Sequence, residues 1–397
     1  MQKTYDVIII GAGPAGSMAA IRLAELGLSV ALLEKDTFPR TKTCGDLVTR
    51  EGLGLLKSVG LGGWIASYRR VDALRFSAPN GSLLDVPVAS PEKEARNRIL
   101  PRAVLDATLA QVAAAQGANL IEGCRVTSVE ITSEAVQVHS SQQSFKGHFL
   151  LLADGSHAPI TRKLGLLREQ PDLMAARQYF HCPHIEPHGP LEFHFQPAIL
   201  PGYTWVFPQG DGSVNLGAGT YTQRINLKEI DLAVVLEEFR RNDPVMAGRF
   251  KDAEPIGQMR AHPLRTNVTS TKTHGERFMV LGDAAGLVSP FTGEGITSGM
   301  LSGAIAAHFL DDIFRAGKFT AEMTAPYTDA LRLRYQGDQQ AGYRLRSALR
   351  TPALLNRFFR MLQRDSSMAD LFAAIMLDEK SPQLMLHVRN LLHLLRA

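Results

Sequence analysis

Three glycine-containing segments follow one another along the 397-residue chain, and their residue types and spacing suit the binding of a nucleotide cofactor. In chain order they are GAGPAG at residues 11–16, DG at residues 154–155, and GD at residues 282–283 with Pro290 and the GEG of residues 293–295. Glycine lets the backbone come close to a ligand, and free N–H groups at the start of a helix bind phosphate. Any one segment alone could mislead, whereas the ordered set indicates a bound dinucleotide.

The first segment has the form of a phosphate-binding turn between a strand and a helix. Residues 5–10 are apolar and rich in β-branched side chains, which is typical of a parallel strand buried on both faces. Gly11 permits the tight turn, Gly13 lets the backbone approach a pyrophosphate, and Gly16 lets the next helix lie close to the strand. That helix begins at about Ala15 and points its N-terminal N–H groups at the phosphates.

Glu34 follows a second predicted strand, residues 29–33, at the position where an acidic side chain binds a ribose hydroxyl. An acid there disfavours a 2′-phosphate, so we do not expect NADP in this site. The alternative is a glycine-rich turn that binds nothing. The strand, the helix and Glu34 in register all favour the nucleotide.

Composition and charge agree with a globular enzyme and exclude several other classes. Hydrophobic residues make up 45% of the chain, and the formal net charge of +4 is too small to indicate a nucleic-acid partner. No apolar run approaches the roughly 20 residues of a membrane-spanning helix. The first strand begins too early for a signal peptide, so we expect a cytoplasmic protein. The three cysteines show no metal-ligand spacing, so we expect no bound metal.

The hydrophobic pattern changes along the chain, which predicts a discontinuous domain. Continuous apolar runs give way, between about residues 170 and 270, to the alternation typical of antiparallel strands. We therefore expect an α/β fold in which a Rossmann-type nucleotide domain is interrupted by an antiparallel-sheet substrate domain and followed by helices. The expected boundaries are residues 1–75, 97–170 and 271–320 for the nucleotide domain, residues 76–96 and 171–270 for the sheet domain, and residues 321–397 for the helical region.

Several motifs resemble those of glutathione-reductase-type flavoproteins, which bind FAD. The resemblance rests on residues 11–16 with Glu34, the pair Arg102 and Asp106, the DG of residues 154–155 and the GD of residues 282–283. More narrowly, the chain is similar to the group that includes aromatic-ring hydroxylases, flavin halogenases and geranylgeranyl reductases. FPRTKTCG at residues 38–45 and PGYTWVFP at residues 201–208 resemble geranylgeranyl reductase patterns. The similarity spans about residues 3–320.

The resemblance implies a non-covalent FAD and a set of residues that bind it. The Asp283 carboxylate would accept hydrogen bonds from the ribityl hydroxyls, unless it is only a helix N-cap. A helix starting near Ile296 would point its N-terminus at the N1–C2=O edge of the flavin and stabilise the anionic reduced form. The alternatives elsewhere are an exposed helix-start arginine at Arg102 and a plain turn at Asp154. The predicted set is Gly11, Gly13, Pro14, Ala15, Gly16, Glu34, Lys35, Arg40, Cys44, Gly45, Arg102, Val126, Asp154, Gly155, Gly282, Asp283, Pro290, Gly293, Gly295 and Ile296.

Cys44 and three aromatic residues form the predicted catalytic set. In the geranylgeranyl reductase resemblance Cys44 faces the flavin beside the substrate, where its thiol could donate a proton or shape the substrate; the alternative is a cysteine that only packs. The alternation of Tyr203, Trp205 and Phe207 places them on one face of a strand. That face walls an apolar substrate cavity or packs against the other domain.

The reaction class is harder to assign than the cofactor. We expect a reductase that passes hydride from flavin N5, with a proton, to carbon–carbon double bonds of an isoprenoid or similar lipophilic polyene. The alternatives are a hydroxylase that forms a flavin C4a-peroxide, a flavin halogenase, and a prenyl-binding protein without redox chemistry. Lys42 and Cys44-Gly45 do not match the halogenase pattern. No second GxGxxG occurs, so we expect NAD(P)H, ferredoxin or flavodoxin to deliver electrons transiently.

The C-terminal region carries a positive charge that the net charge hides. Its arginines are Arg332, Arg334, Arg344, Arg346, Arg350, Arg357, Arg360 and Arg364, opposed only by Asp338; interleaved apolar residues are Leu354, Leu355, Phe358, Phe359, Met361 and Leu362. A basic, apolar-edged helix favours peripheral contact with anionic lipid, a carrier protein or an electron donor. The alternative is a lid whose arginines are solvated and whose apolar residues pack on the FAD domain.

Overall fold

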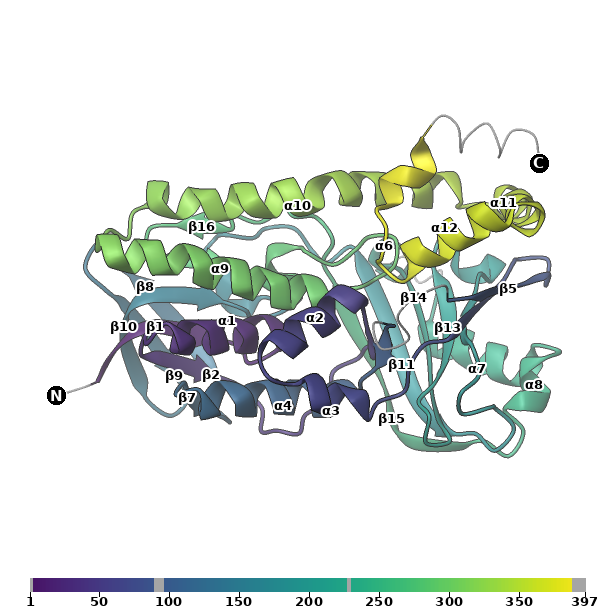
Figure 1. Ribbon diagram of the computed structural model, residues 1–397, viewed down its shortest axis with the longest axis horizontal. Coiled ribbons are helices and arrows are strands. Elements are labelled where there is room, and N and C mark those ends of the chain that lie inside the picture. The colour runs from purple at the N-terminus through teal and green to yellow at the C-terminus, as the bar shows by residue number, and fades with distance from the viewer. Residues whose placement is uncertain (1–2, 89–95, 227–229, 388–397) are drawn as a thin grey trace.

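Two sheets lie side by side along the long axis of the molecule in the computed structural model, which describes residues 3–88, 96–226 and 230–387 (Figure 1). The first sheet is mainly parallel and the second mainly antiparallel, and helices from the C-terminal part of the chain lie over both. The predicted α/β class, with a Rossmann-type sheet, a separate sheet and C-terminal helices, is confirmed. None of the helices within these ranges is long and apolar enough to cross a membrane.

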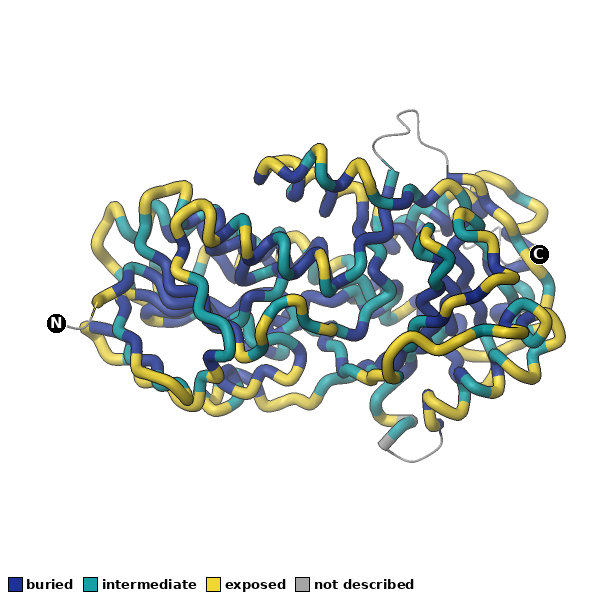
Figure 2. The backbone as a smooth tube through the Cα atoms, turned by 90° about the horizontal axis from the view of Figure 1, so that it is seen from below, coloured by how far each residue is buried: buried dark blue, intermediate teal, exposed yellow. Residues whose placement is uncertain are grey.

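The first sheet has the buried parallel core that the apolar runs predict. Its strand order is β16 (His274–Gly275), β17 (Phe278–Val280), β10 (Ser144–Leu152), β1 (Thr4–Ile10), β2 (Val30–Leu33) and β7 (Asn119–Ile121), with β8 (Val126–Ile131) and β9 (Val136–Ser140) off this path. β1 pairs in parallel with both β10 and β2. These central strands are buried on both faces, and their backbone forms the dark-blue bundle in Figure 2.

Helices around this sheet meet at the carboxyl ends of its parallel strands. α1 (Pro14–Glu25) packs along α9 (Ile296–Ala316) and beside α4 (Arg102–Ala115). The contact with α9 requires glycine, because a Cβ on Gly303 would lie 2.3 Å from the carbonyl oxygen of Ala15. The smaller elements of this half are β3 (Leu47–Val48) paired with β6 (Arg98–Ile99), α2 (Arg50–Ser58), α3 (Gly62–Ala66), α5 (Pro159–Lys163) and the 3₁₀ turn η3 (Gly282–Ala285).

The second sheet has seven strands and separates a helical layer from the rest of the molecule. Its order is β15 (Glu254–Leu264), β11 (Leu173–His181), β14 (Ser213–Tyr221), β13 (Tyr203–Pro208), β12 (Leu191–His194), β4 (Ala73–Ser77) and β5 (Leu83–Pro87). β12 and β4 pair in parallel, so the sheet expected to be antiparallel is mixed at this one pairing. The outer elements are α6 (Thr222–Asn226), α7 (Leu232–Asn242), α8 (Met246–Arg249) and the 3₁₀ turn η2 (Pro197–Ile199).

The C-terminal helices divide between the two halves: the first packs on the nucleotide-binding sheet as well, whereas the next two pack on the second sheet, not on the nucleotide-binding half as the lid alternative had it. They are α10 (Ala321–Ala348), α11 (Pro352–Arg364), α12 (Ser366–Met376) and the 3₁₀ turn η4 (Pro382–Leu386). Phe358 and Phe359 of α11 are buried in a cluster with Phe76 and Phe193 of the sheet. The ring centroids of Phe76 and Phe372 are 4.9 Å apart. The apolar side of α11 is therefore covered by the protein itself, apart from Leu354, which is exposed.

Arg346 is not part of the basic surface that the sequence predicts. The residue is buried, and its guanidinium donates to the carbonyl of Pro290 and to the hydroxyl of Tyr221 while stacking on the Tyr221 ring at 3.7 Å. Arg334 forms an ion pair with Glu51 at 2.9 Å. The count of arginines along the sequence therefore overstates the free charge of this surface.

Candidate functional site

A cavity of about 820 Å³ opens at the carboxyl ends of the parallel strands and is lined from both sheets. All the residues predicted above to bind the cofactor or to be catalytic line this cavity, except Gly16. Gly16 lies behind the phosphate turn, where a Cβ would be 1.9 Å from the carbonyl oxygen of Gly11. Its place in the structure therefore matches close packing of helix on strand rather than contact with a ligand.

The turn between β1 and α1 is fixed by backbone geometry and by one carboxylate. Gly11 has a φ of 100°, and a Cβ there would lie 2.3 Å from the carbonyl oxygen of Ala153. Glu34 is buried, and its Oε2 accepts a hydrogen bond from the N–H of Ala12 at 3.0 Å. The Glu34 side chain thus ties the end of β2 to the turn while lining the cavity.

Two guanidinium groups are held beside the turn by one fully buried carboxylate. Asp106 accepts two hydrogen bonds from Arg102, at 2.7 and 2.8 Å, and forms an ion pair with Arg40 at 3.0 Å. Paired in this way, the guanidiniums keep fixed positions, and each still lines the cavity. The arrangement suits the binding of phosphate or of other anionic oxygens.

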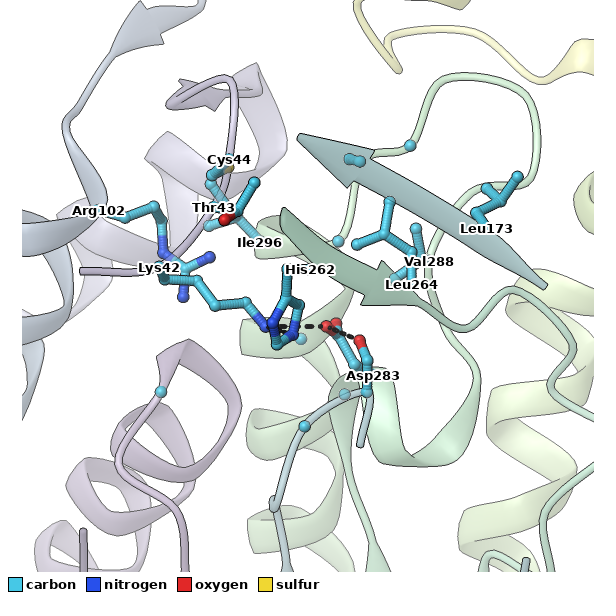
Figure 3. Close-up of a pocket in the computed structure, with 18 of the residues that line it drawn as sticks. Lys42, Thr43, Cys44, Arg102, Leu173, His262, Leu264, Asp283, Val288 and Ile296 are labelled. Carbon is cyan, nitrogen blue, oxygen red and sulfur yellow. Dashed lines mark hydrogen bonds and ion pairs between the residues drawn. The ribbon is translucent and has the colours of Figure 1, made fainter. Parts of the chain in front are cut away.

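Asp283 lies at the centre of a charged cluster that sequence analysis did not foresee (Figure 3). The Nζ of Lys42 is 3.5 Å from its carboxylate and 2.7 Å from the Nε2 of His262, and Ser156 donates to the carboxylate at 2.7 Å. Burial alone would raise the pKa of Asp283, but Lys42 and the Ser156 hydroxyl lower it below its usual range. Burial and Lys42 lower the pKa of His262 to about 3, so this imidazole is neutral and accepts from the ammonium group. Asp283 is therefore an ionised acceptor facing the cavity.

The loop before α9 is held close to Asp283 and to the second sheet. A Cβ on Gly295 would lie 3.3 Å from the Oδ1 of Asp283 and 3.0 Å from Val288. The Tyr203 hydroxyl donates to the carbonyl of Thr292 in the same loop. Small residues and this bond place the N-terminus of α9, with Ile296, at the cavity wall.

Cys44 belongs to a loop that a buried polar network holds in place. Asn215 donates to the carbonyl of Cys44 at 2.8 Å and to the Oδ2 of Asp46 at 2.7 Å, and Tyr179 donates to the same oxygen. The N–H of Asp46 lies 3.3 Å from the sulfur. Burial raises the pKa of Cys44, so the thiol is neutral at physiological pH. A neutral S–H in a fixed position can donate a proton or fill space, but it is not a thiolate nucleophile.

Tyr203, Trp205 and Phe207 form an aromatic wall on the cavity face of β13. Phe193 packs edge-on against Phe207, with ring centroids 5.1 Å apart. The indole of Trp205 crosses Gly217, where a Cβ would lie 2.1 Å from the ring, and its N–H donates to Asn215 at 2.9 Å. The wall is therefore rigid, apolar toward the cavity, and tied through Asn215 to the Cys44 loop.

Comparisons with known proteins decide the family. A match to the FAD binding domain covers residues 4–181, and a match to FAD dependent oxidoreductases covers residues 97–309, more than half of the chain. A menaquinone reductase of Mycobacterium tuberculosis is 31% identical over 328 residues, 78% of each chain. A digeranylgeranylglycerophospholipid reductase of Methanoculleus marisnigri is 30% identical over 339 residues, 82% of this chain and 81% of that protein. The chain belongs to the geranylgeranyl reductase family of FAD-dependent oxidoreductases.

Solved structures agree on the fold. A geranylgeranyl bacteriochlorophyll reductase-like protein of Thermoplasma acidophilum has a TM-score of 0.82 at 23% identity and covers 98% of this chain and 100% of its own. A flavin-dependent brominase has a TM-score of 0.77 at 19% identity, over 96% and 97% of the two chains. At these identities both likenesses show the shared fold alone.

The cavity fits the FAD of this family at the end formed by the first sheet. A Cβ on Gly13 would meet only the Nη2 of Arg40, at 3.6 Å, and one on Gly155 would meet nothing within 4 Å, so bare backbone faces open space at both. Arg40 and Arg102 supply fixed cations, and Asp283 supplies an ionised acceptor for hydroxyls. The roles of these residues toward FAD remain predictions drawn from this fit.

Sequence analysis missed the residues that act on the site through distant contacts. The sequence could have indicated Lys42 as a site residue, because it precedes Cys44 by two residues within the recognised loop. Asp46 follows the same loop and offered a weaker signal. His262 and Asn215 have none, since their partners lie 220 and 171 residues away along the chain.

We predict that Gly13→Val abolishes FAD binding. The fold has room for a side chain at this position, whereas the valine would occupy the space that a pyrophosphate needs. Flavin absorbance per purified chain measures the effect. Gly54→Val is the matched control, because Gly54 is exposed on α2 and a Cβ there meets nothing within 4 Å. Normal flavin content in Gly13→Val would contradict the assignment.

Proposed function

We propose that the protein is a reductase that adds hydride and a proton to carbon–carbon double bonds of an isoprenoid or similar lipophilic substrate. One observation carries the proposal: a single cavity joins a charged end that fits FAD to a rigid apolar wall, with the Cys44 loop lining it beside both. A long apolar chain suits that wall, because it offers aromatic and aliphatic surface. The names of the relatives, which denote reductases of menaquinone and of digeranylgeranylglycerophospholipid, support the same class.

Bound FAD, once reduced, supplies the hydride. The protein orients the substrate, excludes water from the cavity and stabilises negative charge there. The aromatic wall of Tyr203, Trp205 and Phe207 excludes water from the substrate side. The N-terminus of α9 brings its positive dipole end to the cavity wall, where it stabilises negative charge. Asn215 fixes the Cys44 loop and the Trp205 indole together, so the thiol and the wall keep one geometry. We further propose that NAD(P)H or a reduced ferredoxin or flavodoxin delivers the electrons transiently.

Product mass separates this function from its main alternative. The enzyme with oxidised FAD is incubated in air with an electron donor and a polyprenyl lipid, and we expect products heavier by two hydrogens per reduced bond. A gain of one oxygen atom would show a hydroxylase instead and would reject the reductase. Omission of the electron donor is the control, because no product of either kind forms without it.

We predict that Cys44→Ser keeps FAD and its reduction by the donor but slows reduction of the substrate or changes which double bonds react. The thiol faces the cavity and is neutral, so it can hold a proton or shape the bound chain. If it donates the proton directly, the loss is about 10²–10⁴-fold. Stopped-flow absorbance follows the flavin in both half-reactions, and product analysis gives the pattern. A Cys44→Ala enzyme with native turnover and products would leave the residue only a packing role.

We also propose that the surface around α11 contacts anionic lipid from which the substrate is drawn. Arg360 and Arg364 are exposed there, and Leu354 and Leu83 are 48% and 49% exposed on neighbouring elements. The hydrogen bond from Gln363 to the carbonyl of Leu83, at 3.1 Å, joins the two elements. With the rest of the apolar face of α11 buried, attraction is mainly electrostatic and falls with salt.

We predict that replacing Arg357, Arg360 and Arg364 with glutamine weakens binding to phosphatidylserine-containing vesicles by about two orders of magnitude, because each basic residue near such a surface contributes about 1 kcal/mol. Co-sedimentation at low salt measures it. Glutamine at Lys251, Lys272 and Lys318, which are exposed in loops outside α11, gives the same change of charge as a control. Equal vesicle binding by both triple variants would contradict the proposal that the surface around α11 contacts lipid.

A further inference from the structure

Glu294 is a carboxyl group in the cavity wall for which FAD binding gives no role. It lies between Gly293 and Gly295, in the loop that precedes α9, and its side chain lines the cavity. Its Oε1 accepts a hydrogen bond from the N–H of Thr297 at 2.6 Å. Among the described residues Glu294 has no ion-pair partner, in contrast to Asp283 and Asp106, each of which is paired with a cation.

A second carboxyl group, Asp378, lies in the segment that follows α12 and lines the same cavity as Glu294. Asp378 has a φ of 56°, a left-handed conformation that non-glycine residues rarely adopt. Burial and the Asp378 charge raise the pKa of Glu294 to about 8, although hydrogen bonds from Thr297 and Ser298 act in the opposite direction. Burial also raises the pKa of Asp378 to about 6, with Glu51 and Asp338 adding to it and Arg334 opposing it. Glu294 is therefore mostly protonated at neutral pH, while Asp378 is mostly ionised.

The pair is connected to the molecular surface through α10 and α2. The hydroxyl of Tyr335 is buried without a hydrogen-bond partner, and its pKa is raised by burial and by the nearby charges of Glu294, Glu51 and Asp378. Next to it, Arg334 pairs with Glu51, and both side chains are 42% exposed. An unpartnered hydroxyl among carboxyl groups is a position where a water molecule completes a hydrogen-bonded chain. Tyr335 thus lies between the exposed Arg334–Glu51 pair and the two cavity carboxyl groups whose charges influence its pKa.

We propose that Glu294 holds the proton consumed when a substrate double bond is reduced, and that Asp378 and Tyr335 carry its replacement inward from solvent. The proposal rests on the reductase function proposed above. The step balances: the π bond opens, hydride from reduced FAD forms one C–H bond, and a proton forms the other. The Glu294 O–H bond breaks, leaving a carboxylate that regains a proton through Asp378. The proton can pass from Glu294 to the substrate carbon directly or by way of the Cys44 thiol, and the bonds formed and broken are the same in total.

Removal of the titrating group tests the proposal while leaving the helix start intact. Glu294→Gln keeps an oxygen that accepts from Thr297, so we expect normal flavin content and normal reduction by the donor. Reduction of the substrate should slow by about 10²–10⁴-fold, and the fall in its rate above about pH 8 should disappear. Glu379→Gln is the matched control, because Glu379 is the exposed neighbour of Asp378 and does not line the cavity. Unchanged substrate reduction in Glu294→Gln overturns the proposal, even if the products still show added hydrogen.

A titration without substrate gives a second readout that does not depend on activity. Protein labelled with ¹³C at glutamate carboxyl groups should show one resonance that titrates near pH 8 and is missing in Glu294→Gln. In Asp378→Asn the midpoint should move to lower pH, because the negative charge that raises the pKa of Glu294 is gone. The high-pH limb of the rate profile should move with it, which a purely structural role would not produce. An Asp378→Asn profile identical to that of the wild type, or glutamates that all titrate in the usual acidic range, would overturn the relay. An oxygenated product would reject the reductase function and leave this titration as it is.

Discussion

Close contact between backbones, possible only without a Cβ, sets the position of every other group in the cavity. A Cβ at Gly16 would lie 1.9 Å from the carbonyl oxygen of Gly11, and one at Gly303 would lie 2.3 Å from that of Ala15. These two contacts bring α1 against β1 and α9 against α1. As a result, two helices from opposite ends of the chain begin at the same edge of the sheet, and their positive dipole ends face one space. A side chain at Gly16 would push α1 away from β1, and one at Gly303 would push α9 away from α1.

The second sheet and the C-terminal helices complete this space by fixing the loop before α9. Arg346 of α10 binds the carbonyl of Pro290, and Tyr203 of β13 binds that of Thr292, so the loop is held from two sides. The apolar residues of α11 and α12 bury themselves against the same sheet. Arg346, Met376, Leu377 and Asp378 line the cavity, so the C-terminal region forms part of its wall, while packing on the sheet buries most of the apolar face of α11.

Local patterns in the sequence predict the nucleotide-binding turn and its cavity residues. The residues that were missed or misplaced are positioned by contacts between distant parts of the chain. The strand, glycine turn, helix and acid of residues 5–34 follow from periodicity and from turn chemistry, because their contacts are close in sequence or set by a repeated geometry. Lys42 with His262, and Cys44 with Asn215, depend on how one sheet lies against the other, which no local pattern encodes. Arg346 was misplaced for the same reason, since an arginine among other arginines gives no sign that it is buried.

The carboxyl groups in and beside the cavity fall into two classes, those paired with a cation and those without one, and Glu294 belongs to the second. Asp106 and Asp283 are deeply placed, and each carboxylate has a cationic side chain within 3.5 Å. Glu294 has no cation within ion-pair distance among the described residues; burial and the negative charge of Asp378 raise its pKa and favour the neutral acid, although the hydrogen bonds at the start of α9 oppose this. Arg40 and Arg102, held by Asp106, suit the phosphates of a cofactor, and the Asp283 carboxylate suits its hydroxyls. Glu294 can change its protonation state within the ordinary pH range, and a site that reduces a double bond needs a group with that property.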